Sequence, residues 1–142
     1  MAIGVQVVFD AANPAQQARF WAFALNYVVQ PPPPGFDSWA DFAESIGYPR
    51  DWDGLSAAVD PDGVGPRLLF QRVPEPKTVK NRVHIDINAS GADARTEAGW
   101  TKVEARAREL TAHGATVLRE VNEPTGHHLV MTDPEGNEFC VQ

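Results

Sequence analysis

The sequence has 142 residues, of which 43% are hydrophobic and 22% charged, so it is long enough to bury a core and ordinary enough for one compact domain. Its formal net charge of −7 at pH 7 argues against nucleic acid or an anionic membrane as the main partner, because either would need a basic surface. No apolar run approaches the roughly 20 residues of a membrane span, no secretion signal opens the chain, and one cysteine excludes an internal disulfide framework. A cytoplasmic protein is therefore expected.

The first half of the sequence predicts a strand, a helix and three further strands. Residues 3–9 alternate apolar and other side chains, which is typical of a strand. Asn13 followed by Pro14 predicts the start of a helix, since Asn is a good N-cap and proline needs no N–H there; this helix should run to about Asn26. Three strands separated by turn-forming residues follow, at 27–30, 55–59 and 67–73.

Residues 35–53 have no counterpart in the second half and are rich in aromatic side chains. A short helix is predicted over 38–46, and the aromatic residues are Phe36, Trp39, Phe42, Tyr48 and Trp52. One interpretation is a helical cap over an open end of the sheet. The other is a lid or pocket wall for an aromatic or apolar ligand, with Trp39 and Trp52 contacting it, because pocket linings are mostly apolar and aromatic.

The second half repeats the order of the first. Residues 82–88 alternate as a strand, and a helix predicted over 92–113 ends at Gly114, a typical C-terminal cap. Three further strands are predicted at 115–120, 128–132 and 137–142. His127 and His128 are adjacent on a strand, so they face opposite ways and only one of them can reach a given site.

The end of the chain carries the strongest motif. Residues 133–137 read Asp-Pro-Glu-Gly-Asn, which suits a type I turn, and the strand after it places Cys140 on one face and Phe139 on the other. This pattern resembles the closing strand of the vicinal-oxygen-chelate (glyoxalase/bleomycin-resistance/dioxygenase) superfamily. The resemblance implies an α+β fold in one glyoxalase-like domain, 1–142. Two tandem βαβββ modules, about 1–76 (with the aromatic insert 35–53) and about 80–142, would form a curved mixed sheet around a cleft.

The resemblance also implies four inward-facing positions that bind one metal in the superfamily. By strand order they correspond here to Gln6, Gln71, His84 and Cys140. The usual quartet is His or Gln, Glu, His and Glu. Here both glutamates are replaced, one by a neutral amide and the other by a soft, usually protonated thiol. No tightly held metal or other cofactor is therefore expected; if a divalent metal binds, these four residues are its predicted ligands.

Two carboxylates lie two residues from these positions on the same strand faces, Asp86 and Glu138. Either could supply a displaced metal ligand. Without a metal, His84 and Asp86 are close enough on one strand face to act as a general acid/base pair, with Gln6, Gln71, Glu138 and Cys140 contacting the ligand. A histidine and an aspartate that only satisfy each other in a polar cleft are the alternative.

Two functional hypotheses follow. The first is a protein that binds a small organic molecule without a tightly held metal, or a metal-independent lyase. The alternative is a metal-dependent isomerase, lyase or dioxygenase in which the ion stabilises an enediolate-like charge. A homodimer is expected, because exposed strand edges favour pairing and two-fold dimers are the commonest closed assembly.

Overall fold

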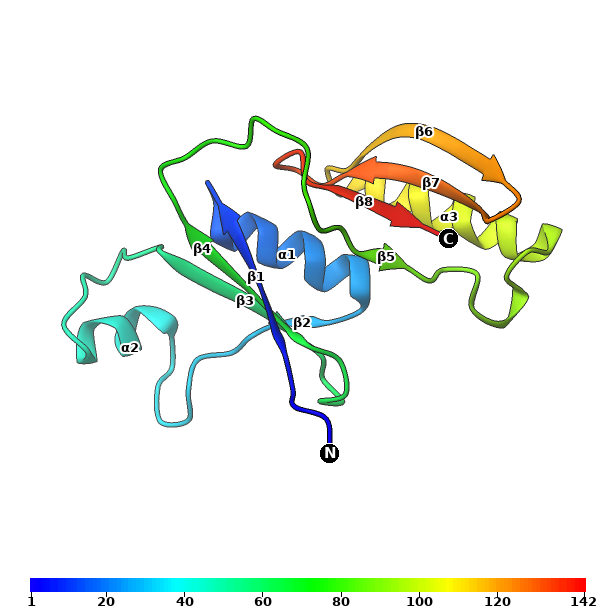
Figure 1. Ribbon diagram of the computed structural model, residues 1–142. Coiled ribbons are helices and arrows are strands. Elements are labelled where there is room, and N and C mark those ends of the chain that lie inside the picture. Colours follow the sequence, from blue (N-terminus) through cyan, green and yellow to red (C-terminus); the bar gives the residue numbers. More distant parts are fainter. The chain divides into compact units, whose positions relative to one another are not determined.

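The computed structural model describes residues 1–142, which fold as two compact units, Met1–Pro74 and Glu75–Gln142. Each unit has one four-stranded mixed sheet with a long helix packed on it (Figure 1). The predicted α+β class with two tandem modules is thus confirmed, and each module has a sheet of its own. None of the helices is long and apolar enough to cross a membrane.

The first unit has the strand order β1-β4-β3-β2. Strand β1 runs parallel to β4, whereas β3 is antiparallel to both of its neighbours. The elements of this unit are β1 (Gln6–Ala11), α1 (Pro14–Leu25), β2 (Val28–Val29), α2 (Trp39–Ser45), β3 (Leu55–Val59) and β4 (Arg67–Arg72).

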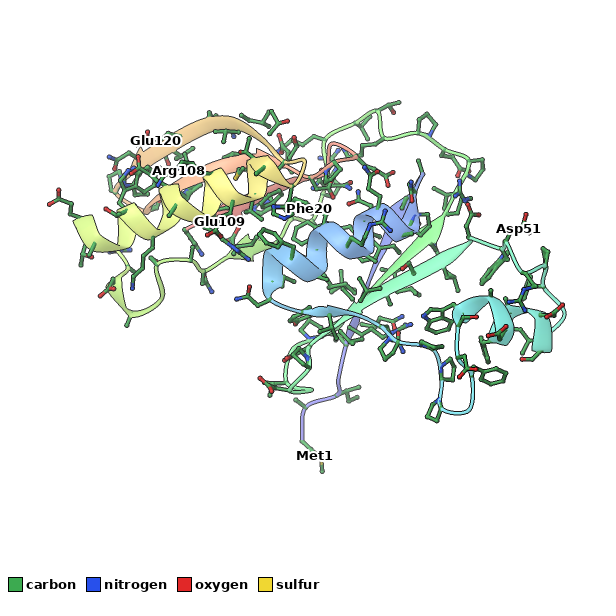
Figure 2. The ribbon with its side chains drawn as sticks, turned by 180° about the vertical axis from the view of Figure 1, so that it is seen from behind. Met1, Phe20, Asp51, Arg108, Glu109 and Glu120 are labelled. Carbon is green, nitrogen blue, oxygen red and sulfur yellow. The ribbon has the colours of Figure 1, made fainter.

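Helix α1 covers one face of this sheet. The Asn13 side chain accepts a hydrogen bond from the Gln16 backbone N–H at 3.1 Å, which confirms the predicted N-cap. On the buried side Trp21 is 1% exposed, and its ring centroid lies 5.5 Å from that of Phe9 on β1. Figure 2 labels Phe20 on α1; its ring packs edge-on against that of Trp21.

The first strand begins later than the sequence predicts. Ile3 and Val5 are 92% and 74% exposed and precede β1, which starts at Gln6. The reason lies in the pairing, because Gln6 is opposite Arg67, the first residue of β4. Before that point the chain has no neighbouring strand to bond, so alternation alone does not make a strand there.

The aromatic segment forms a small structure of its own. The Ser38 hydroxyl accepts a hydrogen bond from the Asp41 N–H at 3.1 Å and starts α2. Within the segment the rings pack on each other, with Phe42 edge-on to Trp39 and Tyr48 stacked on Trp52 at a centroid distance of 4.5 Å. The predicted short helix is present, and its aromatic residues mostly contact one another.

The second unit has the strand order β5-β8-β7-β6, with β5 parallel to β8 and the other pairs antiparallel. Val103 and Leu110 of the long helix are buried, as are Met131 and Phe139 of the sheet. The elements of this unit are β5 (Asp86–Ile87), η1 (Gly91–Asp93), α3 (Glu97–Ala112), β6 (Thr116–Glu123), β7 (Gly126–Thr132) and β8 (Glu138–Val141).

Helix α3 starts five residues later than predicted. Its N-cap is Thr96, whose side chain accepts a hydrogen bond from the Gly99 N–H at 3.0 Å. Before it, a 3₁₀ turn and a left-handed Arg95, with φ of 65°, interrupt the helical backbone. Propensity alone does not reveal this interruption, because Ala92, Ala94 and Arg95 all favour helix.

Strand β5 has two residues where the sequence predicts seven. The Asn81 side chain replaces the missing strand: its Nδ2 donates to the Glu138 carbonyl at 2.8 Å, and its Oδ1 accepts from the Glu138 N–H at 3.1 Å. A side-chain amide therefore satisfies the backbone of β8 where residues 82–84 do not pair. Asn81, which directly precedes the predicted strand 82–88, thus anchors the start of the second module to its sheet.

The closing turn is as predicted. Asp133 is 3% exposed, and its carboxylate accepts hydrogen bonds from the backbone N–H groups of Glu135 and Asn137 at 2.9 and 3.0 Å. Gly136 has a φ of 85°, which glycine adopts without strain. This turn fixes the register of β8, and with it the face on which Cys140 lies.

Candidate functional site

The face of the second sheet that is turned away from α3 carries half of the predicted site residues, namely His84, Asp86, Glu138 and Cys140. Phe139 and Val141 are fully buried on the α3 side, so Cys140 between them points the other way. Across the sheet Cys140 lies opposite Asp86 on β5 and opposite Val130 on β7. We call this surface the open face of the second unit.

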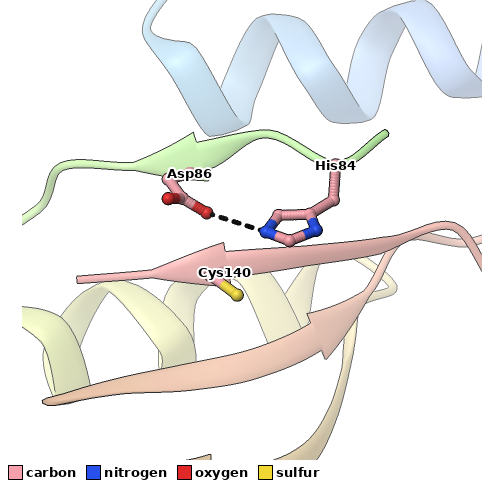
Figure 3. A group of neighbouring side chains, drawn as sticks. All are labelled: His84, Asp86 and Cys140. Carbon is pink, nitrogen blue, oxygen red and sulfur yellow. Dashed lines mark ion pairs between the residues drawn. The ribbon is translucent and has the colours of Figure 1, made fainter. Parts of the chain in front are cut away.

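A cluster of three chemically different side chains lies on the open face (Figure 3). His84 Nε2 is 3.3 Å from Asp86 Oδ1, and the ligand atoms of His84, Asp86 and Cys140 lie within 4.8 Å of one another. The side chains of His84 and Asp86 are 50% and 45% exposed, whereas Cys140 is 8% exposed. An imidazole and a carboxylate that solvent can reach thus stand over a buried thiol.

The environment of Cys140 favours the neutral thiol. Burial raises the pKa of Cys140, and the negative charge of Asp86 raises it further, while Arg119 and Lys80 act in the opposite direction. The thiolate is the nucleophilic and metal-binding form of cysteine. Cys140 is therefore a weak nucleophile in the metal-free protein.

Charged groups of both signs surround this cluster. Lys80 forms an ion pair with Glu138, whereas the Arg119 side chain forms no ion pair. A cavity of about 300 Å³ opens between these groups, within the size of a small-ligand pocket. Its polar lining is formed by Lys80, His84, Asp86, Arg119, His128, Glu138, Cys140 and Gln142.

A β-bulge turns Arg119 toward this cavity. Val117 pairs with Met131, but Arg119 pairs with Val130, so Leu118 is an extra residue in β6. Without the extra residue Arg119 would face α3, because side chains alternate along a strand. The sequence gives no evident sign of this bulge, so sequence reasoning missed Arg119 as a site residue.

His127 and His128 behave as their adjacency requires. His128 lines the cavity on the open face. His127 faces the helix side, where its ring stacks on Trp100. Lys80, just before the predicted strand 82–88, also lines the cavity.

The donor set of the cluster fits a zinc ion in kind and number. Three protein ligands drawn from imidazole, carboxylate and thiolate, with one open position, are typical of catalytic zinc. His84 Nε2 and Asp86 Oδ1 are 3.3 Å apart, a distance that suits two ligands of one ion. The ligand atoms of the three residues are up to 4.8 Å apart. They would have to approach one another by about 1 Å to form Zn–N and Zn–S bonds of about 2.0 and 2.3 Å. The ion would also have to displace the proton of the Cys140 thiol, whose pKa is raised, because cysteine binds metal as the thiolate.

Gln6 and Gln71 lie on one face of the first sheet but are not neighbours. Gln6 is opposite Arg67 and accepts a hydrogen bond from its Nη1 at 2.6 Å, whereas Gln71 is opposite Asp10 and donates to its carboxylate at 2.9 Å. Four residues of strand, about 13 Å, separate the two positions. Within the first unit the two amides therefore do not converge on one point.

The first unit has a cavity of its own, of about 690 Å³, which brings Gln71 together with Trp52 and Leu55. Trp52 lies directly over Gly54, where an added Cβ would be 2.7 Å from the indole ring. Trp39 does not line this cavity, and its Nε1 donates to the Gln30 carbonyl at 2.8 Å. Of the two predicted indoles, Trp52 is thus the one beside a predicted site residue.

Comparison with known proteins gives a family match over nearly the whole chain. The model of the glyoxalase-like domain matches residues 6–142. No curated protein matches the sequence.

Solved structures share the fold at low sequence identity. A glyoxalase/bleomycin resistance protein/dioxygenase family enzyme from Burkholderia phytofirmans is 15% identical with a TM-score of 0.60, covering 96% of this chain and 94% of its own. The fosfomycin resistance protein FosX from Listeria monocytogenes, solved with Mn(II) and a dihydroxypropylphosphonic acid, is 11% identical with a TM-score of 0.63, at coverages of 100% and 90%. A bleomycin-binding protein from Streptomyces verticillus, solved with copper(II)-bleomycin, is 16% identical with a TM-score of 0.55, at coverages of 100% and 96%.

Proposed function

This chain belongs to the glyoxalase-like domain family, and on that premise we propose that it binds a small organic molecule on the open face of its second unit without a tightly held metal. The observation that carries the proposal is the cavity of about 300 Å³ over the His84–Asp86 pair. The bleomycin-binding protein and FosX, which share the fold, were solved with small organic molecules.

The charges of the cavity indicate what kind of ligand would bind. The Arg119 guanidinium lines the cavity and has no acidic partner in the protein, so it is available to an acidic oxygen of a ligand. Glu138 is already paired with Lys80. A molecule with a carboxylate or other oxyanion group at one end suits this arrangement.

The same geometry could support a metal-independent lyase. His84 uses Nε2 toward Asp86, which leaves Nδ1 free to accept or donate a proton. In such a pair the carboxylate orients the imidazole and stabilises its protonated form. His84 would then move the proton, and Asp86 would hold the ring in position.

Thermal unfolding with a library of small carboxylic acids tests the proposal. A ligand at 100 times its dissociation constant adds about 2.7 kcal/mol of stability, which corresponds to a shift of the Tm by about 8 °C for a chain of this size. His84→Ala and Asp86→Asn should remove most of this shift. The matched control is His113→Ala, since His113 lies at the end of α3, outside the cavity; it should leave the shift unchanged.

A metal-dependent isomerase, lyase or dioxygenase is the second candidate, favoured by the three donors within 4.8 Å of one another. His84, Asp86 and Cys140 would hold the ion, which when bound would polarise oxygen atoms of a substrate. Elemental analysis separates the two candidates: the first expects well under one equivalent of divalent metal in the purified protein. One equivalent of zinc, nickel, manganese or iron would favour the second.

A further inference from the structure

A second cavity of the second unit lies on the other side of the sheet, at the start of α3. Its volume is about 430 Å³, and α3 and the turn between β6 and β7 form its walls. It is larger than the cavity on the open face, and the proposed function makes no use of it. Its distinctive lining residues are Ser90, Arg95, Thr96, Trp100, Glu123 and His127.

One wall is a rigid aromatic pair. The rings of Trp100 and His127 are stacked, with centroids 3.4 Å apart and an angle of 14° between their planes. His127 Nε2 lies 2.6 Å from the Glu120 carboxylate, which fixes the orientation of the imidazole. The wall is therefore already ordered without a ligand, so binding would not have to order these rings.

Arg95 lines this cavity and directly precedes Thr96, the N-cap of α3. Its φ of 65° is left-handed and unusual for arginine, and its side chain forms no ion pair or hydrogen bond within the protein. Backbone strain of this kind tends to occur at functional sites. The exposed guanidinium is therefore available to an acidic group of a ligand.

Other polar groups of the cavity also lack a partner. Ser90 is 8% exposed, and its hydroxyl makes no hydrogen bond in the protein. Glu123, the last residue of β6, forms no ion pair. Ser90, Arg95 and Glu123 thus offer polar groups to a ligand in this cavity.

We propose that this cavity binds a zwitterionic amino acid with a flat side chain. The ligand carboxylate would pair with Arg95, near the start of α3, where backbone N–H groups also favour negative charge. Its ammonium group would pair with Glu123, and its side chain would lie along Trp100 and Val103. A purely anionic ligand would meet Glu97 and Glu123 unpaired, and a purely cationic one would meet Arg95.

Titration with L-phenylalanine, followed by two-dimensional ¹H–¹⁵N NMR of the full chain, tests this proposal. The Trp100 indole signal and the backbone signals of Gly99 and Gly126 should shift and saturate, with a dissociation constant of about 1 mM or below. 3-Phenylpropanoate, which lacks the ammonium group, and 2-phenylethylamine, which lacks the carboxylate, should bind at least about tenfold more weakly.

Two variants and one control complete the test. Arg95→Gly should retain or raise the Tm, because it removes a strained residue, yet weaken L-phenylalanine binding at least about tenfold; Glu123→Gln should weaken binding similarly. Arg108→Ala removes the same charge from an exposed position on α3, outside the cavity (Figure 2), and should bind as the parent does. Absence of saturable shifts, equal binding of the amine or carboxylate alone, or unchanged binding by Arg95→Gly would overturn the proposal. The open face plays no part in this test, so its outcome is independent of the proposed function.

Discussion

Replacing Cys140 by glutamate should convert the open face into a tight metal site. The superfamily pattern has glutamate at this position, and the wild-type protein has a buried thiol whose pKa is raised by burial and by Asp86. The new carboxylate would be opposite Asp86 in the sheet, where neighbouring strands lie about 5 Å apart. We therefore expect the substitution to be costly without metal and to be rescued by it.

The magnitude follows from the geometry. Two unit charges 5 Å apart at an effective dielectric constant of 20 repel by about 3 kcal/mol. Asp86 is 45% exposed, and solvent screening reduces this to about 1–2 kcal/mol. Cys140→Glu should therefore be less stable than the neutral control Cys140→Gln by about 1–2 kcal/mol in EDTA at pH 7.

Urea unfolding with and without Mn(II) or Zn(II) provides the assay. Metal at 100 times its dissociation constant adds about 2.7 kcal/mol, so it should more than restore the stability of Cys140→Glu while leaving the control unchanged. Two results would refute the reasoning. One is that metal stabilises wild type and Cys140→Glu equally, and the other is that metal stabilises neither protein.

Three further predictions concern the thiol, the first cavity and assembly. The pKa of Cys140 is higher in the folded than in the unfolded protein, so the thiol contributes its full stability below about pH 8.5 and loses it as the pH rises through the folded pKa. The unfolding free energies of wild type and Cys140→Ala, measured from pH 7 to 10, should therefore converge. A difference that stays constant over this range would contradict the prediction. Gly54→Ala should displace the indole of Trp52, since the new methyl group would lie 2.7 Å from it, and so change tryptophan fluorescence; an unchanged spectrum would contradict the close contact. Sedimentation at micromolar concentration should show a homodimer, and a pure 15.5 kDa species would contradict that expectation.

Much of the fold was predictable because local chemistry fixes it. The Asp133 turn and the Asn13 and Pro14 helix start depend on hydrogen bonds within a few residues, so their sequence signals are sufficient. The parity of β8 follows from the turn, and it correctly places Phe139 inside and Cys140 on the opposite face.

The parts of the fold that the sequence did not predict depend on pairing between segments that are distant in the chain. The exposed Ile3 and Val5 lie outside β1 because β4 begins opposite Gln6. Asn81 replaces part of a predicted strand. The alternation of side chains within one strand does not reveal which distant segment that strand pairs with.

In the candidate site, too, the features set by nearby residues were predictable, and those set by pairing with distant segments were not. The spacing of His84 and Asp86 predicted that they would be neighbours on one strand; the structure places them 3.3 Å apart, although only Asp86 lies in β5. Arg119 was missed because its direction depends on the bulge at Leu118. The offset between Gln6 and Gln71 was likewise not predictable, because the register of two parallel strands is not written in either strand alone.

The most direct test of the central claim is to map where a small carboxylic acid binds. The measurement is ¹H–¹⁵N NMR of the wild-type chain with the best acid from the thermal-unfolding library. The proposed function predicts saturable shifts of the Asp86, Val130 and Cys140 amides, in metal-free buffer, that are lost in His84→Ala. Saturable binding that leaves these amides unmoved, or that persists unchanged in His84→Ala, would contradict it.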